Sequence, residues 1–195
     1  MIKPDSLEET SFNIDNRKLG IWIFLGSEAV FFSALIMTYI VMSGRATGGP
    51  TPAQTLNIPF VAFNTFVLIC SSVTMVTALA HIERGDATGL RRYLIATAML
   101  GLVFLGGQVT EFTMLYQQGV TLHSSLFGAS FFTLTGFHGA HVTIGVIWIL
   151  FVLARAYAGG VTRDNHIGVE MVGLYWHFVD IVWILIFTIV YLVGT

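Results

Sequence analysis

Five long apolar stretches make up most of the chain, and short polar stretches separate them. They lie at about residues 19–42, 59–82, 90–116, 123–157 and 167–193. A helix needs about 20 apolar residues to cross the ~30 Å hydrocarbon core of a bilayer, and every stretch is long enough. The fourth is longer than needed, so we expect it to tilt or to project beyond the bilayer. The pattern predicts an all-α, polytopic membrane protein with five transmembrane helices.

The connecting stretches contain residues typical of turns. Gly and Pro interrupt residues 43–57, and Gly residues mark 83–89 and 158–165. No internal repeat is evident, so we predict one transmembrane domain over residues 19–195. Residues 1–18 mix acidic and basic side chains and lack the apolar core of a cleavable signal peptide, so we expect a cytoplasmic arm there.

The composition is typical of a chain that lies mostly in a membrane. Of the 195 residues, 55% are hydrophobic and 10% are charged, whereas an average soluble domain has about 25% charged residues. The formal net charge of -2 gives no basis for binding nucleic acid. The single cysteine, Cys70, lies inside an apolar stretch, which excludes a disulfide framework or a cysteine metal cage within this chain.

The basic residues are distributed unevenly between the two ends of the predicted helices. The end that bears the N-terminus has eight of them and the other end has one, Arg45. The eight are Lys3, Arg17, Lys18, Arg84, Arg91, Arg92, Arg155 and Arg163. Because loops rich in Lys and Arg stay in the cytoplasm, we expect the N-terminus to be cytoplasmic and the C-terminus to lie outside. The loops are short, so any chemistry lies within the membrane or belongs to a partner.

One carboxyl group lies deep inside the first apolar stretch. Glu28 is about nine residues into it, so at ~1.5 Å per residue it lies near the middle of the bilayer. An ionised carboxylate is costly there, and we expect Glu28 to be protonated, paired or directed at a cavity. It is either a neutral group hydrogen-bonded to a neighbouring helix or a site of lipid contact or proton handling.

Two histidines of the fourth stretch lie three residues apart and share one helical face. His138 and His141 are candidate metal ligands for that reason, but no cysteine or close carboxylate completes a set of ligands. Haem ligation usually takes a second histidine from another helix. We therefore expect hydrogen bonds from these histidines to neighbouring helices, with close helix approach at Gly136, Gly139 and Gly145.

The fifth stretch contains a second polar cluster. His177 and Asp180 follow Trp176 and lie three residues apart, so they can pair, which lowers the cost of burying the carboxylate. We interpret this as a structural hydrogen-bonded pair, because a proton relay would need a continuing chain of partners.

Three further charged residues are expected near the membrane interfaces. Glu111 is toward the outer end of the third stretch, and Glu170 lies one helical turn after His166 at the cytoplasmic end of the fifth. Polarity costs little at an interface, so both carboxyl groups need no functional explanation. Arg155 can extend to lipid phosphates on the cytoplasmic side.

Several of these residues lie in distinctive motifs that follow one another in a fixed order. The motifs occupy residues 18–32, 135–142, 166–170 and 175–183. The first resembles the helix that carries a membrane-buried glutamate in subunit III of haem–copper respiratory oxidases. The second is similar to that family's Thr-Gly-Phe-His-Gly-Leu-His-Val signature, and the last two look like its final helix. The resemblance runs from about Lys18 to the end of the chain.

This resemblance implies an accessory subunit of a proton-pumping terminal oxidase. Members of the family have no haem or copper of their own and no catalytic residue. They pack against subunit I, which holds the haem–copper centre, form a complex with subunit II, and bind phospholipid in a cleft. By position, Glu28 corresponds to the buried carboxylate beside that cleft and Arg155 to a basic residue near lipid phosphate. The positions to which we assign structural roles are His138, His141, Trp176, His177, Asp180, Glu111 and Glu170.

The five spans are similar to the short form of the family, which implies the plasma membrane of a bacterium. The loop at residues 43–51 resembles one in quinol oxidases, whereas Glu28 and the last helix resemble the cytochrome c branch. We expect a cytochrome c oxidase, with a quinol oxidase as the alternative.

Two other classes of protein fit parts of the pattern. A stand-alone membrane cytochrome would bind haem through His138 or His141 together with His177. A small channel or transporter would use Glu28 and Asp180. A haem spectrum of the isolated chain tests the first class, and ion flux from liposomes that contain only this chain tests the second.

Overall fold

The computed structural model describes residues 16–43 and 56–193. The predicted cytoplasmic arm up to residue 15 and the loop at 44–55 lie outside the described residues. The helices are α1 (Asn16–Ser43), α3 (Ile58–Glu83), α4 (Ala87–Gln117), α5 (Leu126–Tyr157) and α6 (Ile167–Phe187), and the π-helix η2 (Thr188–Val193) follows α6 directly.

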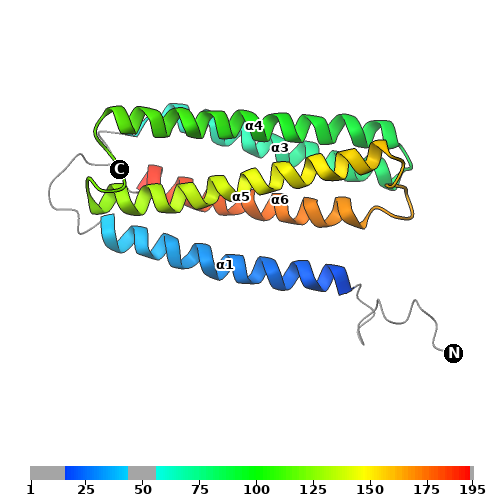
Figure 1. Ribbon diagram of the computed structural model, residues 1–195, viewed down its shortest axis with the longest axis horizontal. Coiled ribbons are helices and arrows are strands. Elements are labelled where there is room, and N and C mark those ends of the chain that lie inside the picture. The colour runs from blue at the N-terminus through cyan, green and yellow to red at the C-terminus, as the bar shows by residue number, and fades with distance from the viewer. Residues whose placement is uncertain (1–15, 44–55, 194–195) are drawn as a thin grey trace.

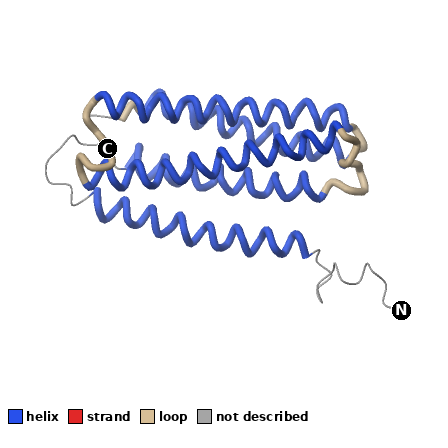
Figure 2. The backbone as a smooth tube through the Cα atoms, in the orientation of Figure 1, coloured by secondary structure: helices blue, strands red, loops and turns tan. Residues whose placement is uncertain are grey.

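The described parts of the chain form an elongated bundle of long helices that lie side by side (Figure 1). Among residues 16–43 and 56–193, five helices are long and apolar enough to cross a membrane, one for each predicted stretch, so the all-α membrane fold is confirmed. Within the described residues the only β-bridge joins Thr162 and Asn165, on either side of the turn between α5 and α6. Figure 2 shows helices connected by short loops.

Side-chain caps begin three of the helices. Asn57 caps α3 and Ser125 caps α5, each by accepting a hydrogen bond from a backbone N–H of the first turn. Asp86 caps α4 in the same way. The backbone N–H of Gly89, together with a hydrogen bond from His81, lowers the pKa of the Asp86 carboxyl below its usual value.

These caps explain where the observed helices depart from the predicted boundaries. Helix α5 begins at Leu126 because Ser125 is its cap, so the predicted start at residue 123 is three residues early. Helix α4 begins at Ala87, three residues before the predicted start at 90, because its first turn contains polar residues that the hydropathy pattern does not mark.

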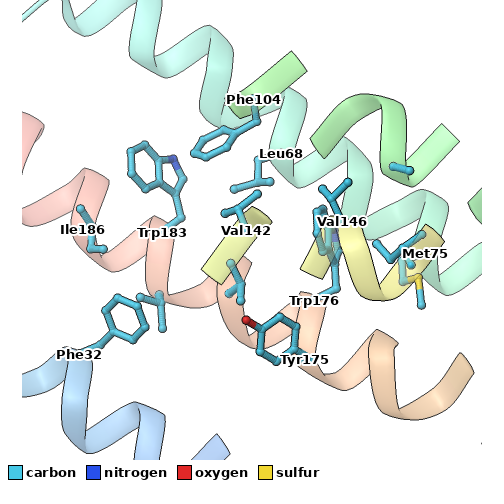
Figure 3. Close-up of a cluster of buried hydrophobic side chains, with 14 of the residues drawn as sticks. Phe32, Leu68, Met75, Phe104, Val142, Val146, Tyr175, Trp176, Trp183 and Ile186 are labelled. Carbon is cyan, nitrogen blue, oxygen red and sulfur yellow. The ribbon is translucent and has the colours of Figure 1, made fainter. Parts of the chain in front are cut away.

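Helix α6 occupies the centre of the bundle. It packs against α1, α3 and α5, and its two indoles also contact α4, which itself packs against α3 and α5. Helix α1 packs mainly against α5 and α6. It is the least buried of the five spans. The two large indoles of α6, Trp176 and Trp183, are fully buried, and Figure 3 shows Trp183 beside Phe104 of α4.

Glycines allow α4 and α5 to pack closely against the indole of Trp176. A Cβ atom on Gly101 would lie 2.7 Å from the Trp176 ring, and one on Gly145 would lie 2.8 Å from it. The expected close approach at Gly145 is therefore present, as it is at Gly139, where a Cβ would lie 2.5 Å from Gln108. At Gly136 the expectation is wrong, because a Cβ there would meet nothing within 4 Å.

The end of the bundle that bears the start of α1 also carries the α3–α4 and α5–α6 connections (Figure 1). The described basic residues of the chain gather there. They are Arg17, Lys18, Arg84, Arg91, Arg92, Arg155 and Arg163. The fold thus places these basic residues at one end of the bundle, as expected from the sequence. That this end faces the cytoplasm stays a prediction.

Candidate functional site

A histidine–carboxyl pair joins α1 to α5. Glu28 Oε2 lies 3.0 Å from His141 Nε2, and both side chains are largely buried. His141 Nδ1 lies 2.7 Å from the Phe137 carbonyl oxygen, so Nδ1 must carry a proton to donate. The Nε2 contact then needs one more proton, on Glu28 or on the imidazole. In either arrangement the pair is neutral overall and holds one proton between the two helices.

The surroundings of this pair are apolar. The Phe32 and His141 rings lie 4.9 Å apart between centroids, and Phe31 is also close. The hydroxyl of Tyr175 donates a hydrogen bond of 3.0 Å to the His141 carbonyl oxygen, which adds α6 to the site. In such a low-dielectric environment the Glu28–His141 hydrogen bond is stronger than it would be in water.

His138 has a different role from that of His141. Its ring stacks on Trp183 with 4.7 Å between centroids, and Phe104 and Phe32 contact it edge-on. It is fully buried, and neither ring nitrogen has a hydrogen-bond partner among the described residues. The expected hydrogen bond to a neighbouring helix is therefore wrong for His138. The ring acts as a packing group among the aromatic side chains of α1, α4 and α6.

A serine of α3 connects the two polar residues of the α6 motif. Ser72 Oγ lies 2.8 Å from His177 Nδ1 and donates a short hydrogen bond to Asp180 Oδ2. The predicted direct pair of His177 and Asp180 is thus replaced by a pair bridged through Ser72. Ser72 is not among the residues predicted from the sequence, although two adjacent serines inside an apolar stretch are a signal for such a contact.

Hydroxyl groups of α3 also satisfy the two indoles of α6. Trp176 donates its ring N–H to Ser71 Oγ and Trp183 donates to Thr65 Oγ1, each at 2.9 Å. A buried indole N–H needs such a partner. These contacts support a structural role for Trp176 and fix the rotation of α6 against α3.

The two carboxyl groups expected at interfaces differ from one another. Glu111 is buried, and its two oxygens lie 2.9 and 3.0 Å from the hydroxyl of Tyr191 in η2. The interfacial interpretation is therefore wrong for Glu111. Glu170 is partly exposed in the first turn of α6, where Lys18 Nζ lies at 2.5 Å and His166 Nε2 at 3.2 Å from its oxygens.

A cavity of about 350 Å³ lies at the same end of the bundle. The guanidinium-bearing residues Arg17 and Arg155 line it, together with His166, Trp148 and Met171. Cationic and apolar side chains together line the cavity, and they match the two parts of a phospholipid, a phosphate and its acyl chains.

The histidines and carboxylates of the described residues do not gather into one cluster. Among residues 16–43 and 56–193, no group of three or more His, Cys, Asp and Glu side chains is placed to hold a metal ion. The sequence prediction that this chain binds no metal stays a prediction, but the three candidate histidines each have a different protein environment.

Comparison with known proteins places the whole bundle in one family. The family model described as "Cytochrome c oxidase subunit III" matches residues 8–195. Quinol oxidase subunit 3 of Bacillus subtilis is 42% identical over 176 residues, which are 90% of this chain and 86% of that protein. Cytochrome c oxidase subunit 3 of Bacillus sp. PS3 is 38% identical over 179 residues, or 92% of this chain and 86% of that protein. Cytochrome bo(3) ubiquinol oxidase subunit 3 of Pseudomonas aeruginosa is 36% identical with the same coverage. The chain therefore belongs to the cytochrome c oxidase subunit III family, the third subunits of haem–copper respiratory oxidases.

Proposed function

We propose that this chain is the accessory, non-catalytic subunit III of a proton-pumping cytochrome c oxidase in the plasma membrane of a bacterium. Subunits I and II are its partners, and the haem and copper belong to them. The observation that carries this proposal is how the polar residues of the family motifs are satisfied. Glu28 pairs with His141, Ser72 joins His177 to Asp180, and these contacts hold helices to one another.

Phospholipid binding is the second part of the proposal. The cavity lined by Arg17, Arg155 and Trp148 has the guanidinium groups that bind phosphate well, and it lies at the end where the basic residues gather. We place that end at the cytoplasmic surface, because basic residues favour that side. A phospholipid held there would seal the junction between this subunit and its partners.

Cytochrome c is the proposed electron donor of the complex. The buried Glu28, which the sequence resemblance associates with the cytochrome c branch, supports this choice. A quinol is the second candidate, because the Bacillus subtilis relative at 42% identity is a quinol oxidase subunit. Oxygen consumption by the purified complex distinguishes the two: we expect turnover with reduced cytochrome c, and turnover with a quinol alone would replace the first candidate with the second.

The substitution Glu28→Ala tests the role of the histidine–carboxyl pair. We expect the oxidase to assemble with its haem intact and then to lose bound phospholipid, to take up protons more slowly, or to lose activity several-fold faster during turnover. Removing the carboxyl leaves the His141 imidazole without its partner on α1, and removes the proton that the pair shares. Phospholipid per haem, stopped-flow proton uptake and the decay of activity are the measurements.

The matched control is Glu28→Gln, which keeps the size and a hydrogen bond to His141 but cannot hold an exchangeable acid proton. If Glu28 handles protons, Glu28→Gln fails in proton uptake and keeps its lipid. If both variants keep the lipid content and proton kinetics of the parent, Glu28 is a packing residue only.

A further inference from the structure

A groove runs along α6 between α1 and α3, and we call it the α1–α3–α6 groove. It has a volume of about 300 Å³. Lys18 and Glu170 line it near the start of α1 and α6, and His177 lines it two turns farther along α6. The rest of the lining is apolar: Trp22, Met75, Val76, Leu79, Gly173 and Leu174. Glu170 and His177 are seven residues apart on α6, so the groove covers about 10 Å of depth at ~1.5 Å per residue. The groove thus extends from the Lys18–Glu170 ion pair to His177.

The polar groups continue inward from His177. Its Nδ1 lies 2.8 Å from Ser72 Oγ, and the Ser72 hydroxyl in turn bonds Asp180 Oδ2. Asp180 is thirteen residues from the start of α6, which places it about 20 Å along the helix. The continuing chain of partners that a relay requires is therefore present from the groove to Asp180.

Asp180 is the inner end of this chain. It is 5% exposed, and within the described residues Ser72 is its single hydrogen-bond partner, since its Oδ1 atom is buried with none. A carboxylate in such a place, without a cation beside it, is strongly disfavoured in its ionised form, so Asp180 is stabilised by taking up a proton.

No titratable group of the packed helices competes for Asp180. Helices α1, α3, α4 and α5 contact α6, and η2 continues it. Their titratable and charged side chains are Arg17, Lys18, Glu28 and Tyr39 of α1, Cys70, His81 and Glu83 of α3, Arg91, Arg92, Tyr93, Glu111 and Tyr116 of α4, His138, His141, Arg155 and Tyr157 of α5, and Tyr191 of η2. The hydrogen bonds and ion pairs of Asp180 in the described part of the chain include none of these.

We propose that Asp180 is a reversible proton-binding site, loaded from the α1–α3–α6 groove through His177 and Ser72. A proton from water in the groove binds Nε2 of His177. The ring passes the proton on Nδ1 to Ser72 Oγ, and the hydroxyl proton of Ser72 moves to Asp180 Oδ2. The net change is one proton added to the carboxylate, and the hydroxyl and the neutral imidazole are restored. The chain ends at Asp180, so the site stores a proton and does not conduct it further. The proposal concerns residues separate from Glu28 and holds for either electron donor.

Infrared spectroscopy of the intact oxidase complex in lipid nanodiscs tests this proposal. We expect a carbonyl stretch of a protonated carboxylic acid that Asp180→Asn removes and that exchanges when H₂O is replaced by D₂O. In Ser72→Ala the band remains but moves to higher frequency, because the carboxyl loses its hydrogen bond. Its exchange slows about tenfold or more, because a positioned proton-transfer group is missing. Thr77→Ala is the control on the same helix, since its hydroxyl bonds the carbonyl of Val73 and lies outside this chain of groups.

Two outcomes would overturn the proposal. One is that no acid band at any pH responds to Asp180→Asn or Ser72→Ala, which would make Asp180 a permanent hydrogen-bond acceptor. The other is that Ser72→Ala and the parent exchange at the same rate. If Asp180→Asn fails to assemble, the frequency shift in Ser72→Ala still decides the assignment. Oxygen reduction by the same preparations tests the proposed subunit role. A preparation that reduces oxygen but gives either of these two outcomes contradicts the proton-binding proposal alone.

Discussion

Replacement of Trp183 by alanine is expected to destabilise the subunit by about 3–5 kcal/mol, as measured for large aromatic side chains removed from packed cores. Trp183 is 2% exposed and packs on His138 and Phe104. It also donates the hydrogen bond that satisfies Thr65 Oγ1. Alanine would leave a cavity at the contact of α3, α4, α5 and α6 and expose the unpartnered His138 ring. The measurement is the temperature or detergent concentration at which this subunit leaves the purified complex.

The control is the same substitution at Trp22. Its indole is 59% exposed on α1, so Trp22→Ala removes an equal volume without opening the packed interior. We expect Trp22→Ala to leave the dissociation midpoint within the range of ordinary surface substitutions, about 0.5 kcal/mol. Equal losses for the two variants would contradict the packing described for α6.

The substitution Gly145→Val is expected to cost about 1–3 kcal/mol or to displace α6 from α5, because it forces extra atoms into a filled contact. The first added carbon would already lie 2.8 Å from the Trp176 ring and 3.2 Å from the Tyr175 ring. Gly101 of α4 approaches the same ring, since a Cβ there would lie 2.7 Å from it. Heat-induced loss of the subunit from the complex measures the effect.

Gly136→Val on the same helix is the matched control. A Cβ at Gly136 would meet nothing within 4 Å, so the variant shares the change in helix propensity but causes no clash. The difference between the two variants therefore isolates the contact with Trp176. A smaller effect at Gly145 than at Gly136 would show that α5 and α6 are farther apart than described.

The membrane fold is the part that sequence reasoning predicts well. Burial in lipid demands about 20 apolar residues in every span, and that demand leaves a clear pattern along the chain. The helix starts are predicted less well, because caps such as Ser125 and Asp86 are single polar residues that hydropathy averages away. The π-helical end of the last span, Thr188–Val193, has no counterpart in the pattern.

The polar residues of the bundle could be singled out from the sequence, but their partners could not. Spacing along one helix shows that two residues share a face and leaves open which helix lies opposite. Glu28 and His141 were both candidates, yet only the packing of α1 on α5 brings them together. The same packing separates the roles of His138 and His141, and it places Ser72 between His177 and Asp180.

The interfacial expectation for Glu111 fails for a related reason. Its position toward the end of an apolar stretch suggested contact with water or headgroups, but position along the helix says nothing about direction. Glu111 points into the bundle, where Tyr191 supplies a hydrogen bond to the carboxyl group. The partner lies 80 residues away in the sequence, which no local pattern reveals.

Purification of the intact oxidase through a tag on this chain tests the central claim most directly. After identification of the co-purified proteins by mass spectrometry, the subunits are separated and the haem spectrum of each is recorded. We predict that oxidase subunits I and II co-purify with this chain, and that the haem stays with them. A chain that purifies alone, or that carries a stoichiometric haem after separation, would contradict the account.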